Sequence, residues 1–170
     1  MKSLAILSIF GFALSSCIIP QSNHVVPKYY LLVSSYEDSN SSQSDSGLSF
    51  YLNEVRLSQY LQDNRLVYRP TSEIIEFREN ERWGEPLEEG ICRIVGKNLS
   101  QLMRTLNYGV YPHRKKFNID REIEITVDRF EKISRKDVRL KAFWEIRQKE
   151  GQPSRFSYDE IFPILEPTTK

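Results

Sequence analysis

The sequence predicts an α/β fold that leans towards α+β, with a mixed, largely antiparallel central sheet and one long amphipathic helix packed on it. Two segments predict the sheet: residues 122–130 and 138–147 alternate apolar and polar side chains, which is typical of antiparallel strands with one buried face. The segment 86–106 predicts the helix, because its apolar residues recur at three- and four-residue spacing. The length of 170 residues favours one domain.

The N-terminus has the pattern of a bacterial lipoprotein signal. Met1-Lys2 supplies positive charge, and the apolar run 3–13 is much shorter than the roughly 20 residues that a membrane-spanning helix needs. The run ends in Leu14-Ser15-Ser16-Cys17, where small residues admit a peptidase and the thiol accepts a diacylglyceryl group. We predict a signal peptide over 1–16 and lipid attachment, with fatty acids such as palmitate, at Cys17. The alternative is an ordinary secretory signal with a chance cysteine.

A short tether is predicted to connect the lipid anchor to the folded domain of the mature chain. Two or more acyl chains hold a protein stably on a membrane, whereas one myristoyl-sized chain holds it weakly. Polar residues and prolines predict the tether over 17–28, ahead of a domain over 29–165 and a tail over 166–170. Residues 34–47 are rich in Ser, Asp and Asn, cannot contribute to a core, and are predicted to form a mobile loop inside the domain.

The first half of the domain is predicted to consist of short strands. Aromatic and branched residues predict a strand over 29–33 and another over 48–57, and a change of apolar parity places a bulge near Asn53-Glu54 in the second. A tight turn or single helical turn follows over 58–63. Strands over 65–69 and 73–78 are then predicted to form an antiparallel hairpin.

The second half combines the helix with a meander. Pro86 suits the first helical position, and Glu88 and Glu89 suit the positive N-terminal end of the helix. A short strand is predicted over 108–111, and a third meander strand over 155–162 follows the two alternating segments.

Composition narrows the function classes. The formal net charge of +1 argues against nucleic acid as a partner, because nucleic-acid-binding domains carry a clear basic excess. Cys92 lies among apolar helical residues and is expected to be a buried structural thiol. No catalytic motif is recognisable, and the two histidines, His24 and His113, lie in the tether and in a polar loop. We therefore expect no enzymatic activity, no cofactor and no metal site.

Two blocks carry a family resemblance. The first is Tyr60-Leu61-Gln62-Asp63-Asn64-Arg65-Leu66-Val67-Tyr68-Arg69, and the second is Glu81-Arg82-Trp83-Gly84-Glu85-Pro86-Leu87-Glu88-Glu89-Gly90-Ile91, continuing into Asn98-Leu99. Behind the Cys17 tetrad and the strand at Tyr29-Tyr30-Leu31, they resemble the ABC-type transport auxiliary lipoproteins, which include the Pqi C-subunit. Members carry Leu-x-x-x-x-Leu/Ile-Val-x-Arg and then Arg-Trp-x-x-Pro-Leu at the start of a helix.

The resemblance implies a non-catalytic periplasmic component of a lipid-transport assembly. Such proteins are thought to sit on the outer membrane and dock periplasmic proteins of the mammalian-cell-entry (MCE) type, which pass phospholipid between membranes. Ile18 follows the acylated cysteine, in place of the Asp that retains many lipoproteins at the inner membrane. We therefore expect a lipid-anchored protein on the periplasmic face of the outer membrane.

Four residues in the two blocks are candidates for partner binding: Arg65, Arg69, Arg82 and Trp83. Arginine and tryptophan are enriched among the residues that dominate interface energies. The structural alternatives remain open. Trp83 can instead cover the N-terminus of the helix, and the arginines at 65 and 69 can pair with Glu73, Glu76 or Glu79 on the neighbouring strand.

One departure from the family pattern adds further alternatives. Members usually close with an amphipathic helix after the last strand, whereas here Glu166-Pro167-Thr168-Thr169-Lys170 follows it. The sheet face is then expected to be covered in another way, by a partner, or by a second copy in a homo-oligomer. An uncovered face also allows a domain that carries lipid itself. A purely structural envelope lipoprotein is the third possibility.

Overall fold

A mixed sheet with one α-helix along it forms the part of the chain that the computed structural model describes, residues 25–34, 46–113 and 118–164, and this confirms the predicted fold class. Several sequence predictions lie outside these residues: the signal peptide, Cys17, most of the tether and of the Ser-rich loop, and the tail. In the described part of the chain, no helix is long and apolar enough to cross a membrane.

The elements follow the predicted order closely. They are β1 (Lys28–Tyr30), β2 (Phe50–Leu52), β3 (Arg56–Leu57), the short 3-10 helix η1 (Gln59–Gln62), β4 (Arg65–Tyr68), β5 (Glu76–Trp83), α2 (Leu87–Met103), β6 (Tyr108–Val110), β7 (Arg121–Lys132), β8 (Asp137–Gln148) and β9 (Ser154–Pro163).

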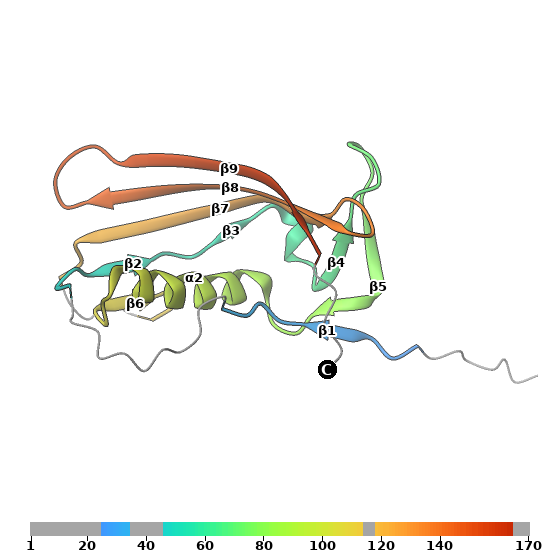
Figure 1. Cartoon of the computed structure of the whole chain (residues 1–170), viewed down its shortest axis with the longest axis horizontal. Helices are drawn as coiled ribbons and strands as arrows, with labels where there is room; N and C mark the ends of the chain where they lie inside the picture. Colours follow the sequence, from blue (N-terminus) through green and yellow to red (C-terminus); the bar gives the residue numbers. More distant parts are fainter. Residues whose placement is uncertain (1–24, 35–45, 114–117, 165–170) are drawn as a thin grey trace, which may run out of the picture.

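The three long strands β7, β8 and β9 form the predicted antiparallel meander, which runs along the long axis of the molecule (Figure 1). On its other side, β7 pairs in parallel with β2, β3 and β4, and β2 pairs in parallel with β6. The hairpin of β4 and β5 is antiparallel, as predicted, and β5 also pairs in parallel with β1. Helix α2 lies alongside β2 and β6 (Figure 1).

The predicted bulge near Asn53-Glu54 is confirmed. Leu52 pairs with Ile123 and Arg56 pairs with Thr126. Between these two pairs the chain moves four residues along the β2–β3 segment but only three along β7, so the β2–β3 segment contains one extra residue. The extra residue splits the predicted strand into β2 and β3.

Strand β5 begins later than the predicted segment 73–78, at Glu76, and runs on beyond it to Trp83. The added segment is polar, and the sequence therefore gave no sign of a strand there. It is held by β1, because Lys28, Tyr29 and Tyr30 pair in parallel with Glu81, Arg82 and Trp83.

Helix α2 is shorter at both ends than the predicted segment. Pro86 is its N-cap rather than its first helical residue, and Glu88 and Glu89 occupy the first turn, where carboxylates favour the helix dipole. Arg104 ends the helix in a left-handed conformation with φ of 50°, and its backbone N–H donates to the carbonyl groups of Ser100 and Gln101.

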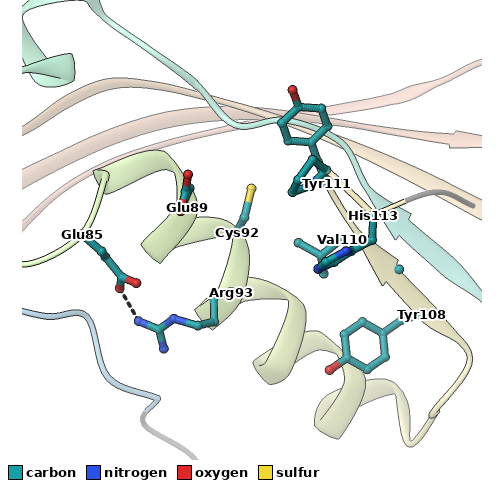
Figure 2. Close-up of a pocket in the computed structure, with 10 residues that line it drawn as sticks. Glu85, Glu89, Cys92, Arg93, Tyr108, Val110, Tyr111 and His113 are labelled. Atoms are coloured by element: carbon teal, nitrogen blue, oxygen red, sulfur yellow. Dashed lines mark hydrogen bonds and ion pairs between the residues drawn. The ribbon is translucent and has the colours of Figure 1, made fainter.

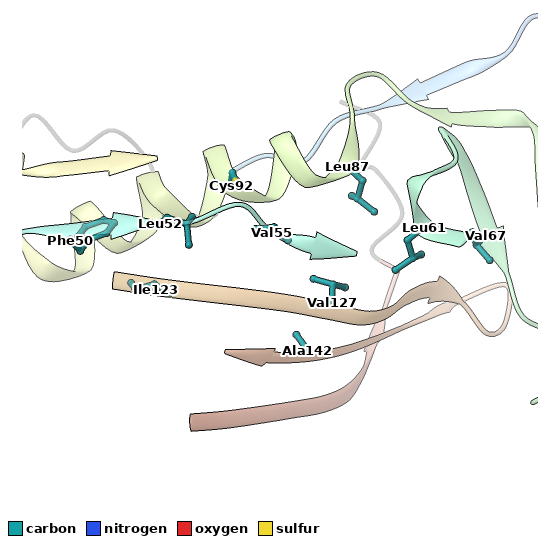
Figure 3. Packing of buried hydrophobic residues seen from close by; sticks show 10 residues of the cluster. All are labelled: Phe50, Leu52, Val55, Leu61, Val67, Leu87, Cys92, Ile123, Val127 and Ala142. Atoms are coloured by element: carbon teal, nitrogen blue, oxygen red, sulfur yellow. The ribbon is translucent and has the colours of Figure 1, made fainter. Parts of the chain in front are cut away.

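The core lies where α2, β2 and the β7–β8 pair meet (Figure 3). Phe50 and Leu52 are completely buried, and Phe50 also stacks on Tyr108 with ring centroids 5.2 Å apart. Cys92 is buried in this cluster, as predicted, and its thiol lies 3.8 Å from the carbonyl oxygen of Asn53. The apolar stripe of the helix thus covers the sheet near β2, β6 and β7.

Candidate functional site

A cleft of about 700 Å³ lies between the N-terminal half of α2 and the segment of β6 that continues to His113 (Figure 2). Glu85, Glu89, Cys92 and Arg93 line one wall. The opposite wall consists of the segment Tyr108–His113, so aromatic and apolar side chains face charged ones across the cleft. This combination is typical of a binding cleft, in which apolar surface supplies affinity and a few polar groups supply orientation.

Two glycines, Gly96 and Gly109, allow the segments around the cleft to pack closely together. A Cβ atom at Gly96 would lie 2.6 Å from Cγ2 of Val110, and a Cβ atom at Gly109 would lie 2.9 Å from Cδ2 of Tyr51. The helix can therefore approach β6 this closely only because position 96 has no side chain.

A paired substitution tests this close contact. Gly96→Ala is expected to lower the free energy of unfolding by about 1–3 kcal/mol, because the added methyl group must displace Val110 in a packed interior. Gly90→Ala is the control on the same helix, since the three atoms nearest to its Cβ all belong to the flexible side chain of Glu85, the first of them at 2.9 Å. Urea unfolding of both variants should show Gly90→Ala equal to the parent or slightly more stable. Equal losses in the two variants would contradict the packing argument.

The charged wall is organised by an ion pair between Arg93 and Glu85 (Figure 2). The guanidinium of Arg93 also donates to the carbonyl of Leu32, 3.2 Å away, and so ties the segment after β1 to the helix. Burial raises the pKa of the Cys92 thiol, which keeps it protonated and a poor nucleophile. Among the described residues, no group of His, Cys, Asp and Glu is arranged to hold a metal ion.

Arg65, the first predicted partner-binding residue, lies in a local ion-pair network. Its guanidinium contacts Asp63 at 2.8 Å and Glu79 at 2.6 Å, and it lies 4.6 Å from the ring centroid of Phe77. The pairing with Glu79 was one of the sequence alternatives. Hydrogen bonds from Arg65 lower the pKa of Asp63 to about 2.

Arg69 belongs instead to a buried cluster that the sequence did not predict. Its Nε donates to Glu131 at 2.6 Å, Nε of Arg129 donates to the same oxygen at 2.7 Å, and the Tyr60 hydroxyl donates to the other oxygen at 2.5 Å. The Glu131 side chain has no exposed surface. Burial and the hydrogen bond to Glu131 raise the pKa of Tyr60 to about 12. Arg69 therefore has a structural role in joining β4 to β7.

Arg82 and Trp83 point to opposite sides, because they are consecutive residues of strand β5. Trp83 stacks on Phe130 of β7 with ring centroids 5.6 Å apart and packs against the core. Arg82 makes one long hydrogen bond, 3.4 Å to the Glu79 carbonyl, and its strand partner Tyr29 is 64% exposed. The structure thus separates the four candidates, and Arg82 is the one arginine among them without an ion pair in the described part of the chain.

Sequence reasoning missed the cleft residues Tyr108 and Tyr111. The available signal was Gly109 between aromatic residues in a short strand, since glycine in a strand marks a close approach of another segment. Glu131 carried no local signal at all.

Solved structures share this fold. One is the crystal structure of an uncharacterised protein whose sequence is 17% identical to this chain. It has a TM-score of 0.64, and the match covers 82% of this chain and 81% of that one. A protein from Xanthomonas campestris, described under the family name DUF330, is 11% identical, with a TM-score of 0.61 over 82% of this chain and 80% of that one. At these identities the likeness concerns the fold alone. No curated protein matches the chain.

The described residues form a mixed sheet with one α-helix and a cleft between α2 and β6. The sequence profile described as "ABC-type transport auxiliary lipoprotein component" matches residues 30–161, and the chain belongs to this family. The resemblance seen in the two sequence blocks is thereby confirmed.

Proposed function

We propose that this protein is a lipoprotein of the outer membrane that acts, without catalysis, as the auxiliary component of an ABC transporter of the MCE type, and that it docks the periplasmic MCE protein. The observation that carries this proposal is the family match over residues 30–161, since the family is described as an auxiliary component of ABC-type transport. The tetrad ending in Cys17 supports a lipid anchor, and Ile18 after it supports sorting to the outer membrane.

Two surfaces are suited to the docking role. The first is the cleft between α2 and β6, which offers Tyr108 and Tyr111 to an apolar segment of a partner. The second is the edge formed by Tyr29 of β1 and Arg82 of β5, which are neighbours in the sheet. Tyrosine and arginine are the residue types that most often dominate interface energies.

Purification of the acylated full-length protein from envelopes in mild detergent tests the proposal. We expect an MCE protein and its ABC transporter to be recovered with it. Arg82→Glu is expected to reduce this recovery at least about tenfold, since placing a like charge at an interface costs more than the roughly 1.4 kcal/mol that a tenfold change represents.

Arg135→Glu is the matched control, because Arg135 is an exposed arginine in the turn between β7 and β8. It should leave the recovery unchanged. Absence of any MCE protein from the purified material would contradict the docking role, and equal losses in the two variants would contradict the assignment of Arg82.

A further inference from the structure

One face of the meander is apolar well beyond the area that α2 covers. Cross-strand pairs on this face join Ile123 to Ile146, Trp144 to Phe156 and Ala142 to Tyr158. Ile123 and Ala142 are buried, but on β9 the side chains of Phe156, Tyr158 and Phe162 are 47%, 38% and 40% exposed. Trp144 stacks on Phe156, and Tyr158 stacks on Phe162, with ring centroids 5.6 Å and 6.1 Å apart. The face therefore ends in a strip of aromatic rings.

Where this strip meets the helix there is a groove of about 310 Å³. Its walls are the C-terminal half of α2 and the ends of β7, β8 and β9 that lie away from β1 (Figure 1). The apolar lining consists of Leu99, Met103, Ile123, Ile146 and Phe156, and the polar lining of Arg121, Gln148 and Ser154.

Arg121 is an unusual residue for such a groove. It is partly buried, and within the described parts of the chain its guanidinium has no ion pair and no hydrogen bond. The other arginines of β7, β8 and β9 are paired with carboxylates, for example Arg139 with Asp159 and Arg147 with Glu124. The adjacent carboxylate of Asp120 is already engaged by Ser49 and Lys149.

The groove therefore combines an apolar wall with a cation that no described residue pairs with. Guanidinium groups bind phosphate with two parallel hydrogen bonds, and partial burial strengthens such a pair. Gln148 and Ser154 add neutral hydrogen-bond donors beside Arg121. The ligand that satisfies all of these groups has a phosphate at one end and a hydrocarbon chain at the other.

We propose that this groove binds one acyl chain of a glycerophospholipid, with the lipid phosphate against Arg121 and the chain against Leu99, Met103 and Phe156. The volume is at the lower limit of ligand pockets, which span about 300 to 1,000 Å³, and so it suits part of one chain rather than a whole lipid. The aromatic strip of Trp144, Tyr158 and Phe162 continues the apolar surface for the remainder. This goes beyond the docking role, because it gives the domain a lipid ligand of its own.

Photolabelling of the acylated full-length protein in nanodiscs tests the site. Two probes carry the same photoreactive acyl chain, one as phosphatidylglycerol and one as diacylglycerol, which lacks the phosphate. We expect phosphatidylglycerol to label peptides containing Met103 and Phe156 several-fold more strongly than diacylglycerol does. Arg121→Glu should reduce the phosphatidylglycerol labelling to the diacylglycerol level.

Arg155→Glu is the matched control, since it makes the same charge change on β9 next to Phe156 but on the opposite face of the sheet. It should label as the parent does, and circular dichroism melts establish that both variants are folded. Labelling that is independent of Arg121, or spread over both sheet faces, would overturn the proposal. The proposal would also be overturned if the protein formed a dimer that buries the groove, if Arg121→Glu dissociated this dimer, and if neither lipid probe labelled the groove. None of these results bears on the recovery of an MCE protein, so the two proposals fail separately.

Discussion

Replacing Glu131 with glutamine is expected to lower the free energy of unfolding by about 3–5 kcal/mol, the cost of removing one member of a buried ion cluster. The Glu131 side chain is fully buried, and the side chains of Arg69 and Arg129 that it pairs with are only 16% and 23% exposed. Removing the negative charge leaves two partly buried cations close together without the carboxylate that forms the ion pair with both of them. Chemical denaturation at neutral pH measures the loss.

Glu145→Gln is the matched control, because Glu145 also bridges two arginines. Its partners, Arg147 and Arg155, lie at 2.7 Å but are 51% and 76% exposed. Water solvates these guanidinium groups when the carboxylate charge is removed, so the unfolding midpoint should hardly change. Similar losses of unfolding free energy in Glu131→Gln and Glu145→Gln would mean that burial does not determine how much the Glu131 cluster contributes to stability.

The stability difference between the parent protein and Glu131→Gln is expected to depend on pH. Burial raises the pKa of Glu131, but the hydrogen bonds from Tyr60, Arg69 and Arg129 outweigh it and hold the pKa below its usual value of 4.5. The folded state therefore binds fewer protons than the unfolded state in this range. The stabilisation is complete above the unfolded pKa and is lost as the pH falls through the folded pKa.

The difference in stability between the parent and Glu131→Gln should accordingly narrow as the pH is lowered from about 6 to about 3. A difference that stays constant over this range would mean that the Glu131 carboxylate is not the titrating group.

The second large effect is expected at Cys17. With the native signal, Cys17→Ala should abolish incorporation of radiolabelled palmitate, because the thiol that accepts the lipid is missing. When an ordinary cleavable signal replaces residues 1–16 of this variant, the domain should be released from the membrane. The membrane-bound fraction should fall at least about tenfold, because no acyl chain remains to hold it.

Cys92→Ala is the control, since Cys92 is the other cysteine of the chain and is buried in the core. It should retain both the palmitate label and the sedimentation with outer membranes. Palmitate incorporation that persists in Cys17→Ala would place the anchor elsewhere.

The sequence was sufficient for the elements with a strong periodic pattern. Strands β7 and β8 alternate over most of their length, and α2 carries an apolar stripe, so their existence and order followed directly. The bulge between β2 and β3 was also readable, because the apolar parity changes at Asn53-Glu54 and one face of the strand must stay buried.

The parallel pairings and the site depended on long-range contacts that no local pattern records. Strands of three residues, such as β2 and β6, do not reveal the direction in which they pair. Glu131 is buried by Tyr60 and Arg69, which come 71 and 62 residues earlier in the chain. For the same reason Arg69 and Trp83 were grouped with Arg82 as surface candidates, although tertiary contacts turn them towards β7.

Site-specific photo-crosslinking in intact cells tests the docking role most directly. A photoreactive amino acid is placed at Tyr29 beside Arg82, at Tyr111 in the cleft, and at Phe143, which is 41% exposed on β8, as a control away from both surfaces. The docking role predicts an adduct with an MCE protein from Tyr29 or Tyr111 and none from Phe143. Adducts with no MCE protein from either docking position, in cells that produce the acylated protein normally, would contradict it.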